Sequence, residues 1–335
     1  MPRFALPALA FSLLASCSDA AEVAPVPSHP RSPSVAAAPF ALAFVEGGRA
    51  HVVLDATPDV TRASGAPELR SLEDPVVVAT HVSAPSGAAI DAWLGRRVRL
   101  YGTTGPVCEG VLRAVALVGR VSPHEGTLSR WRGGEDDQAP LTPAAIAGEA
   151  WAVATEGGGV VLAGELDADG CEGALWAGLA DTPAPEFHAS EAADAETESR
   201  ALAAFRALPA WAEVAARYHD EVREERAPRW DTHGESRPTV NVIDLGASRL
   251  VVVTADVGGG CGDFGATQTT IFRDGARGLE VVGAPIDASF VPTSAADVDG
   301  DGALDLVLPN GVRRAIGGSF ERAEAIEVPF LGCPC

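Results

Sequence analysis

The chain has 335 residues and a formal net charge of −21 at pH 7, from 46 acidic and 25 basic residues. All of the basic residues are arginine, because the sequence contains no lysine. A pI of about 4.6 argues against a nucleic acid or an anionic lipid surface as partner, since either requires a basic face. The length is sufficient for two domains of ordinary size.

Residues 1–16 have the pattern of an export signal. Met1-Pro2-Arg3 provides a basic start, and the apolar run Phe4–Ala15 follows. Roughly a dozen apolar residues are too few to span a bilayer but suit the central region of a signal peptide. The run ends in Leu14-Ala15-Ser16-Cys17, and the polar pair Ser18-Asp19 comes next.

Leu14-Ala15-Ser16-Cys17 resembles the lipobox of bacterial lipoproteins. The resemblance implies cleavage after Ser16 and a diacylglyceryl group on Cys17, usually with a further acyl chain such as palmitate. Two or more acyl chains hold a protein stably at a membrane. The resemblance therefore implies a lipid-anchored protein of the cell envelope. Ser18 after the cysteine favours the outer membrane if the cell is Gram-negative. A secretory signal with a chance cysteine is the alternative.

Residues 17–39 are predicted to form a tether. Five prolines are spaced among alanine, serine and valine, which favours an extended, semi-rigid chain without a core.

Residues 40–185 are predicted to form an N-terminal β domain of the sandwich or barrel type, because short apolar runs alternate with glycine and proline turns. The predicted strands are 50–54, 76–78, 97–101, 111–121, 151–154 and 160–162, with a short helix over 87–94.

Residues 186–228 are predicted to be helical, and residues 236–335 to form a second β domain. Ser190 is the expected N-cap of the first helix, and Pro209 separates it from a second amphipathic helix. The second domain has predicted strands at 250–254, 267–272, 279–282 and 304–308. The predicted fold class is thus mainly β, with two antiparallel domains flanking a helical insertion.

Five cysteines remain besides Cys17, and outside the cytoplasm they should oxidise. We expect one disulfide between Cys108 and Cys171, and another from Cys261 to Cys333 or Cys335. Sequence alone does not determine the pairing. One cysteine is left over, either as a free thiol or in an intermolecular bond.

The segment Asp297–Asp305 has the composition of a calcium loop. Carboxylates stand at loop positions 1, 3, 5 and 9, and Gly302 at position 6 permits a sharp turn. Calcium takes six to eight oxygen ligands, which a tight acidic loop can supply. Two carboxylates about 5 Å apart repel by roughly 3 kcal/mol at an effective dielectric near 20, which favours a bound cation. The metal-free alternative is a solvated acidic turn.

The same segment resembles the strand–loop–strand calcium loop of FG-GAP repeats. The resemblance implies side-chain ligands from Asp297, Asp299, Asp301 and Asp305, with the backbone carbonyl of Ala303, around one structural calcium ion. Only one such loop is present, so the resemblance extends to the loop and not to a propeller.

Familiar catalytic motifs are absent or unsupported. Gly260–Gly265 matches G-x-G-x-x-G, but a strand pattern follows where a dinucleotide site needs a helix. Cys261 as a nucleophile, with His233 as its base, is less favoured than a disulfide.

The leading hypothesis is a non-enzymatic, calcium-stabilised binding or scaffolding module of the cell envelope. The expected partners are the membrane, through Cys17, and an unidentified envelope protein or glycan. One alternative is a hydrolase of envelope polymers with a carboxylate-based site in a cleft. Another is a structural spacer in an envelope assembly.

Overall fold

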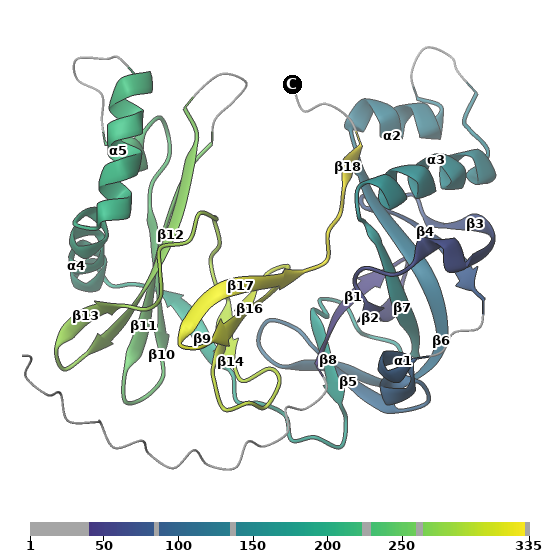
Figure 1. Ribbon diagram of the computed structural model, residues 1–335, viewed down its shortest axis with the longest axis horizontal. Coiled ribbons are helices and arrows are strands. Elements are labelled where there is room, and N and C mark those ends of the chain that lie inside the picture. Colours follow the sequence, from purple (N-terminus) through teal and green to yellow (C-terminus); the bar gives the residue numbers. More distant parts are fainter. Residues whose placement is uncertain (1–39, 84–86, 135–138, 223–228, 259–263, 332–335) are drawn as a thin grey trace, which may run out of the picture. The chain divides into compact units, whose positions relative to one another are not determined.

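The computed structural model describes residues 40–83, 87–134, 139–222, 229–258 and 264–331. They belong to one of the two units into which the contacts of the chain divide, Val35–Cys335. The structure is mainly β, with 44% strand and 21% helix, and its strands form two antiparallel sheets (Figure 1). The predicted fold class is therefore confirmed.

The first sheet has the strand order β3-β4-β6-β5-β8-β1-β2-β7, with a further pairing between β6 and β7. The short strand β18 adds to β6 in parallel. The strands are β1 (Ala41–Glu46), β2 (Arg49–Asp55), β3 (Ala63–Ser71), β4 (Val76–Val82), β5 (Arg97–Tyr101), β6 (Pro106–Pro123), β7 (Val160–Asp167), β8 (Trp176–Leu179) and β18 (Phe330–Leu331).

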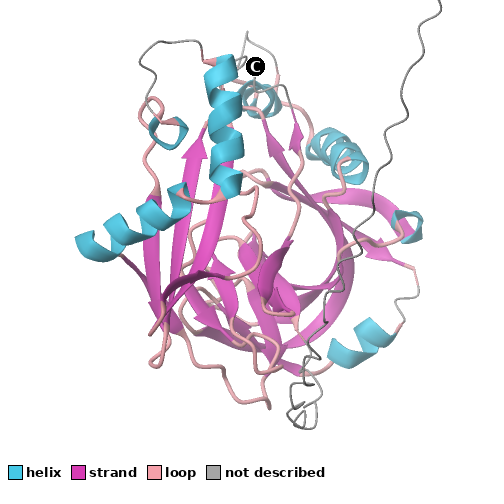
Figure 2. Ribbon diagram, turned by 60° about the vertical axis from the view of Figure 1, so that its left-hand side comes forward, coloured by secondary structure: helices cyan, strands magenta, loops and turns pink. Residues whose placement is uncertain are grey.

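This sheet curves into a half-barrel, and Figure 2 shows the curvature of its strands. Antiparallel neighbours follow the path β3-β4-β6-β7-β2-β1. The two ends of this path, β3 and β1, come together at the turn after β1. Gly47 of that turn lies so close to β3 that a Cβ atom on it would be 3.3 Å from the backbone oxygen of Arg70. The φ of Gly47 is 58°, a left-handed conformation that favours glycine.

Alternate residues of these strands face opposite sides of the sheet. On β4, Val76 and Val78 join the main core, whereas Val77 and Ala79 belong to a smaller apolar cluster on the opposite face. Helices α1 (Ala88–Trp93), α2 (Glu125–Arg132) and α3 (Pro143–Glu156) contribute to the main core, and a 3-10 turn spans Val60–Arg62. The concave side of the half-barrel thus carries the smaller cluster.

The second sheet has the order β13-β12-β11-β10-β9-β14-β15-β16-β17. Its strands are β9 (His188–Ala192), β10 (Thr239–Asp244), β11 (Arg249–Val257), β12 (Ala266–Gly275), β13 (Gly278–Val281), β14 (Ser294–Ala296), β15 (Asp305–Leu308), β16 (Gly311–Ile316) and β17 (Ser319–Ala325). Helices α4 (Ala195–Arg206) and α5 (Pro209–Glu221) and a 3-10 turn at Trp230–Thr232 cover one face.

Two predicted elements are wrong. Residues 151–154 were predicted as a strand but lie within α3, which Thr142 caps through its side chain and which Pro143 begins. Ser190 was predicted as a helix N-cap but lies in β9, paired with Ile243 of β10. The cap of α4 is Asp194, whose side chain accepts a hydrogen bond from the amide of Thr197.

Candidate metal site and cavities

The acidic loop, Asp297–Asp305, connects β14 to β15, and Ala296 and Asp305 face each other at the base of this hairpin. Gly300 and Gly302 have φ values of 74° and 88°, in the left-handed region that favours glycine. The two glycines thus let the backbone reverse direction tightly, so that carboxylates spaced two residues apart converge.

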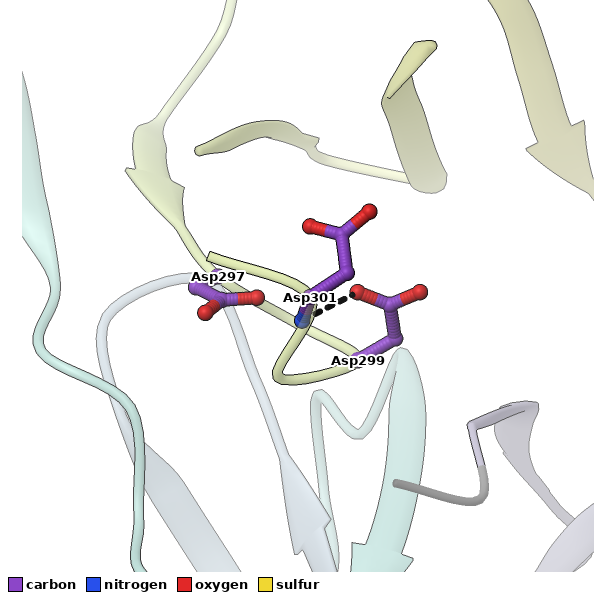
Figure 3. A group of neighbouring side chains, drawn as sticks. All are labelled: Asp297, Asp299 and Asp301. Atoms are coloured by element: carbon purple, nitrogen blue, oxygen red, sulfur yellow. Dashed lines mark hydrogen bonds between the residues drawn. The ribbon is translucent and has the colours of Figure 1, made fainter. Parts of the chain in front are cut away.

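The loop brings three predicted ligands together. Asp297, Asp299 and Asp301 each offer one oxygen, and these oxygens lie within 4.8 Å of one another (Figure 3). Asp299 Oδ1 accepts a hydrogen bond from the Asp301 amide at 3.2 Å, and Asp297 Oδ2 accepts one from the Gly302 amide at 3.0 Å. Asp297 Oδ1 is buried and has no hydrogen-bond partner among the residues that the structure describes. The cluster can therefore hold a metal ion.

Asp305 does not belong to this cluster. Its Oδ1 accepts a hydrogen bond from the Ala315 amide at 2.7 Å, and its Oδ2 accepts one from the Val298 amide at 3.3 Å. Burial raises the pKa of Asp305 to about 6, against the effect of these bonds and of Arg314. Asp305 thus holds the base of the loop against β16. The Ala303 amide donates to Asp301 Oδ1 at 2.8 Å.

Arg314 of β16 is a site residue that the sequence analysis missed. Its guanidinium pairs with Asp299, and also with Asp305 at 3.4 Å and Glu324 at 3.7 Å. A metal ion would compete with this guanidinium for Asp299. No local motif reports such a contact, because it depends on the pairing of β15 with β16.

The predicted disulfide between Cys108 and Cys171 is present. It connects β6 to the segment that follows β7, within the first sheet. The other cysteines, Cys17, Cys261, Cys333 and Cys335, lie outside the described residues.

An aromatic cluster lies beside the acidic loop. Tyr101 and Trp176 are buried and stacked, with ring centroids 4.0 Å apart, and pack with Val298 of the loop. They line a pocket of about 200 Å³ together with Asp297 and Asp299. The indole Nε1 of Trp176 is buried without a hydrogen-bond partner in the described part of the chain. Sequence patterns did not indicate this pocket, because its walls come from distant segments.

The half-barrel cavity, of about 270 Å³, opens on the concave face of the first sheet. Small apolar residues form much of its wall: Val77, Ala79, Ala114, Ala116, Val118 and Ala163. Charged or polar side chains also line it: Glu46, Arg49, His51, Arg70 and Glu165.

His51 is the buried polar residue of this cavity, with 8% of its surface exposed. Its ring stacks on Phe44 with centroids 4.8 Å apart. Among the described residues, the imidazole has no hydrogen-bond partner. Burial lowers the pKa of His51 to about 4, with Glu165 opposing the shift and Arg49, Arg120 and Arg70 adding to it. His51 is therefore neutral at pH 7.

Two ion pairs flank His51. Arg49 Nη1 lies 2.5 Å from Glu165 Oε1, and Arg120 Nη2 lies 2.8 Å from Glu46 Oε1. Arg120 also lies over the ring of Phe44, 4.7 Å from its centroid. Burial raises the pKa of Glu46, although Arg120 opposes this shift. The cavity therefore combines charges of both signs with a neutral imidazole.

A wider cleft, of about 610 Å³, lies between α5 and strands β11 and β12. Three carboxylates line it, from Glu213, Asp256 and Asp287. Asp256 Oδ1 accepts a hydrogen bond from the Thr267 hydroxyl at 3.2 Å.

Comparisons with protein-family models, with curated proteins and with solved structures give no match at the level of significance applied. In the part of the chain that the structure describes, no helix is both long and apolar enough to cross a membrane. Of the predicted calcium ligands, Asp297, Asp299 and Asp301 form a cluster that could hold a metal ion.

Replacing Asp305 should destabilise the protein far more than replacing Asp301. Asp305→Ala leaves Arg314 and two backbone amides short of an acceptor, and we expect a loss of about 3 kcal/mol in the free energy of unfolding. Asp301→Ala, at an exposed position, should change it by less than about 1 kcal/mol when EDTA is present. Urea denaturation measures both. Equal losses in the two variants would contradict the structural role of Asp305.

Acid should destabilise the protein through His51. The folded-state pKa of about 4 lies below the unfolded value of 6.5, so the unfolded state binds the proton first and stability falls as pH drops through this window. Between about pH 7.5 and about pH 4.5 the wild type should lose about 2 to 3 kcal/mol more than His51→Phe. Urea denaturation at both pH values measures this difference. His81→Gln, at an exposed histidine, is the control. Parallel pH profiles for wild type and His51→Phe would refute the assignment.

Proposed function

We propose that this protein is a lipid-anchored component of the bacterial cell envelope that acts as a non-enzymatic, calcium-stabilised binding or scaffolding module. The observation that carries the calcium assignment is the convergence of Asp297, Asp299 and Asp301 within 4.8 Å on one tight loop. The lipobox-like segment ending at Cys17 supports the anchor. Its likeness to outer-membrane lipoproteins, through Ser18, supports that membrane if the cell is Gram-negative.

Calcium fits the donor set of the loop. All three side chains offer carboxylate oxygens, the hard ligands that calcium prefers over softer nitrogen and sulfur donors. The unpartnered Oδ1 of Asp297 supports a cation at this position, because a buried carboxylate oxygen is costly without a partner. Further oxygens would come from the backbone of the loop, including Ala303, or from water.

The role of the ion would be structural. The loop joins β14 to β15, which pair with each other and with β9 and β16, so an ion there would fix the connection between two neighbouring strands inside the second sheet. Arg314 already neutralises part of the charge of Asp299. Because a metal must displace or share this guanidinium, we expect the weak affinity typical of extracellular calcium modules, about 10⁻⁴ to 10⁻³ M.

The partner in this proposal is an envelope protein or glycan, with the lipid holding the protein at the membrane. The formal charge of −21 supports a partner that does not require a basic surface.

Calcium should raise the stability of the full chain. At about 10 mM calcium and a dissociation constant of 10⁻⁴ to 10⁻³ M, the gain should be about 1.4 to 2.7 kcal/mol. Calorimetric titration and the melting temperature in calcium against EDTA measure it. Asp301→Asn should remove most of the gain, whereas Asp169→Asn, on another acidic turn, should retain it. The loop assignment fails if calcium produces neither heat nor a rise in melting temperature.

Cys17→Ser should release the protein from the membrane fraction, because the acyl chains have no other attachment in this proposal. Fractionation of cells and incorporation of an alkyne-labelled palmitate into the protein provide the two readouts. Ser18→Ala leaves the cysteine in place and should remain labelled and membrane-bound. If Cys17→Ser stays labelled and in the membrane fraction, the lipid anchor on Cys17 is wrong.

A further inference from the structure

His51 lines the half-barrel cavity and is more than nine-tenths buried, but its ring nitrogens are not among the fully enclosed polar atoms that lack a partner, so they face the open space of the cavity. Polar groups that face such a space form hydrogen bonds to water or to a ligand that displaces the water. Neutral imidazole carries one donor and one acceptor nitrogen. A molecule in the cavity could satisfy either nitrogen.

The cavity has room for a small organic molecule. Its volume of about 270 Å³ far exceeds the share of one water molecule, about 30 Å³, and approaches the lower limit of pockets for drug-sized ligands, about 300 Å³. The space exists because alanines stand at neighbouring positions of adjacent strands, as in the pair Ala116 and Ala163. Valine or isoleucine, which favour strands, would fill it. The alanines leave a shallow apolar floor.

A bulge in β6 places these alanines on the cavity face. The register between β6 and β7 shifts between Leu112 and Ala114, so the strand changes parity there. Leu112 lies in the main core, whereas Ala114 and Ala116 line the cavity. Without the shift, the residue after Leu112 would face the cavity, so Arg113 would line it in place of Ala114. The bulge therefore determines which side chains line the cavity.

The charges of the lining indicate the class of ligand. Each charge of the lining already has a counter-charge, because Arg49 pairs with Glu165, Glu46 with Arg120 and Arg70 with Glu68. A guanidinium group suits a carboxylate and a carboxylate suits an ammonium group, so a ligand that carries both charges can bind to both members of such a pair. A singly charged ligand would displace one member of a pair and leave it without a counter-charge, whereas a zwitterion replaces both partners.

We propose that the half-barrel cavity binds a free α-amino acid with a small aliphatic side chain. The zwitterionic head lies among the arginine and glutamate side chains and His51, and the aliphatic group lies on the alanine floor. This site shares no lining residue with the acidic loop, so the proposal does not depend on calcium.

Calorimetric titration of the full chain with L-valine tests the proposal, with isovalerate and isobutylamine as the analogues that lack one charged group. L-Valine should bind at least about tenfold more tightly than either analogue, since each loses a charge-assisted hydrogen bond. His51→Phe retains an aromatic ring against Phe44 and should weaken valine binding by about tenfold or more. The titrations are repeated in EDTA and should be unchanged, which separates this site from the calcium site.

Ala116→Leu should fill the cavity and abolish valine binding while the melting temperature shows that the variant is folded. Ala216→Leu makes the same change at an exposed position of α5 and should bind like the wild type. The proposal is overturned if valine does not bind at about 10 mM, if isovalerate binds as tightly as valine, or if a folded Ala116→Leu variant binds valine like the wild type.

Discussion

The second half of strand β6 buries both of its faces, and the first sheet is organised around that requirement. Strand β6 has 18 residues and pairs with β4, β5, β7 and β18. Leu117 belongs to the main core beneath the helices, and Val118, the next residue, belongs to the cluster on the concave face. A flat sheet would expose one of these faces. Curvature into a half-barrel protects the second face without a second layer of helices, and it encloses a cavity where the side chains are small.

The strands were predictable where the signal is local. Branched apolar runs such as 76–78 and 250–254 favour strands, and both are strands here. The run 151–154 is too short to distinguish a strand from a buried helix by its apolar character. The signals that would have identified the helix stand upstream, in Thr142 and Pro143, which form an N-cap and a first turn. In the same way, Asp194 rather than Ser190 was the available cap.

The acidic cluster was predictable for the same reason, since Asp297, Asp299 and Asp301 lie on one turn of chain. Asp305 was assigned with them because it follows the spacing of the loop. Its environment is set by β16, whose Ala315 amide and Arg314 side chain occupy its oxygens. The half-barrel cavity was not predictable, because six strands and a bulge assemble its lining. The sequence of a short strand does not show that His51, rather than another of its residues, lines a cavity.

Arginine is the counter-ion of the buried carboxylates in this acidic protein. The acidic loop differs from the other buried carboxylates in how its charges are paired. Buried carboxylates are matched by guanidinium groups, as in Asp231 with Arg206 and Asp274 with Arg249. The rigid fork of arginine suits such pairs better than lysine would. Within the loop, Asp299 follows this rule through Arg314. Among the described residues no arginine pairs with Asp297 or Asp301, although their oxygens converge on that of Asp299. The loop thus gathers three carboxylates around a single paired guanidinium, and a divalent ion there would complete the neutralisation.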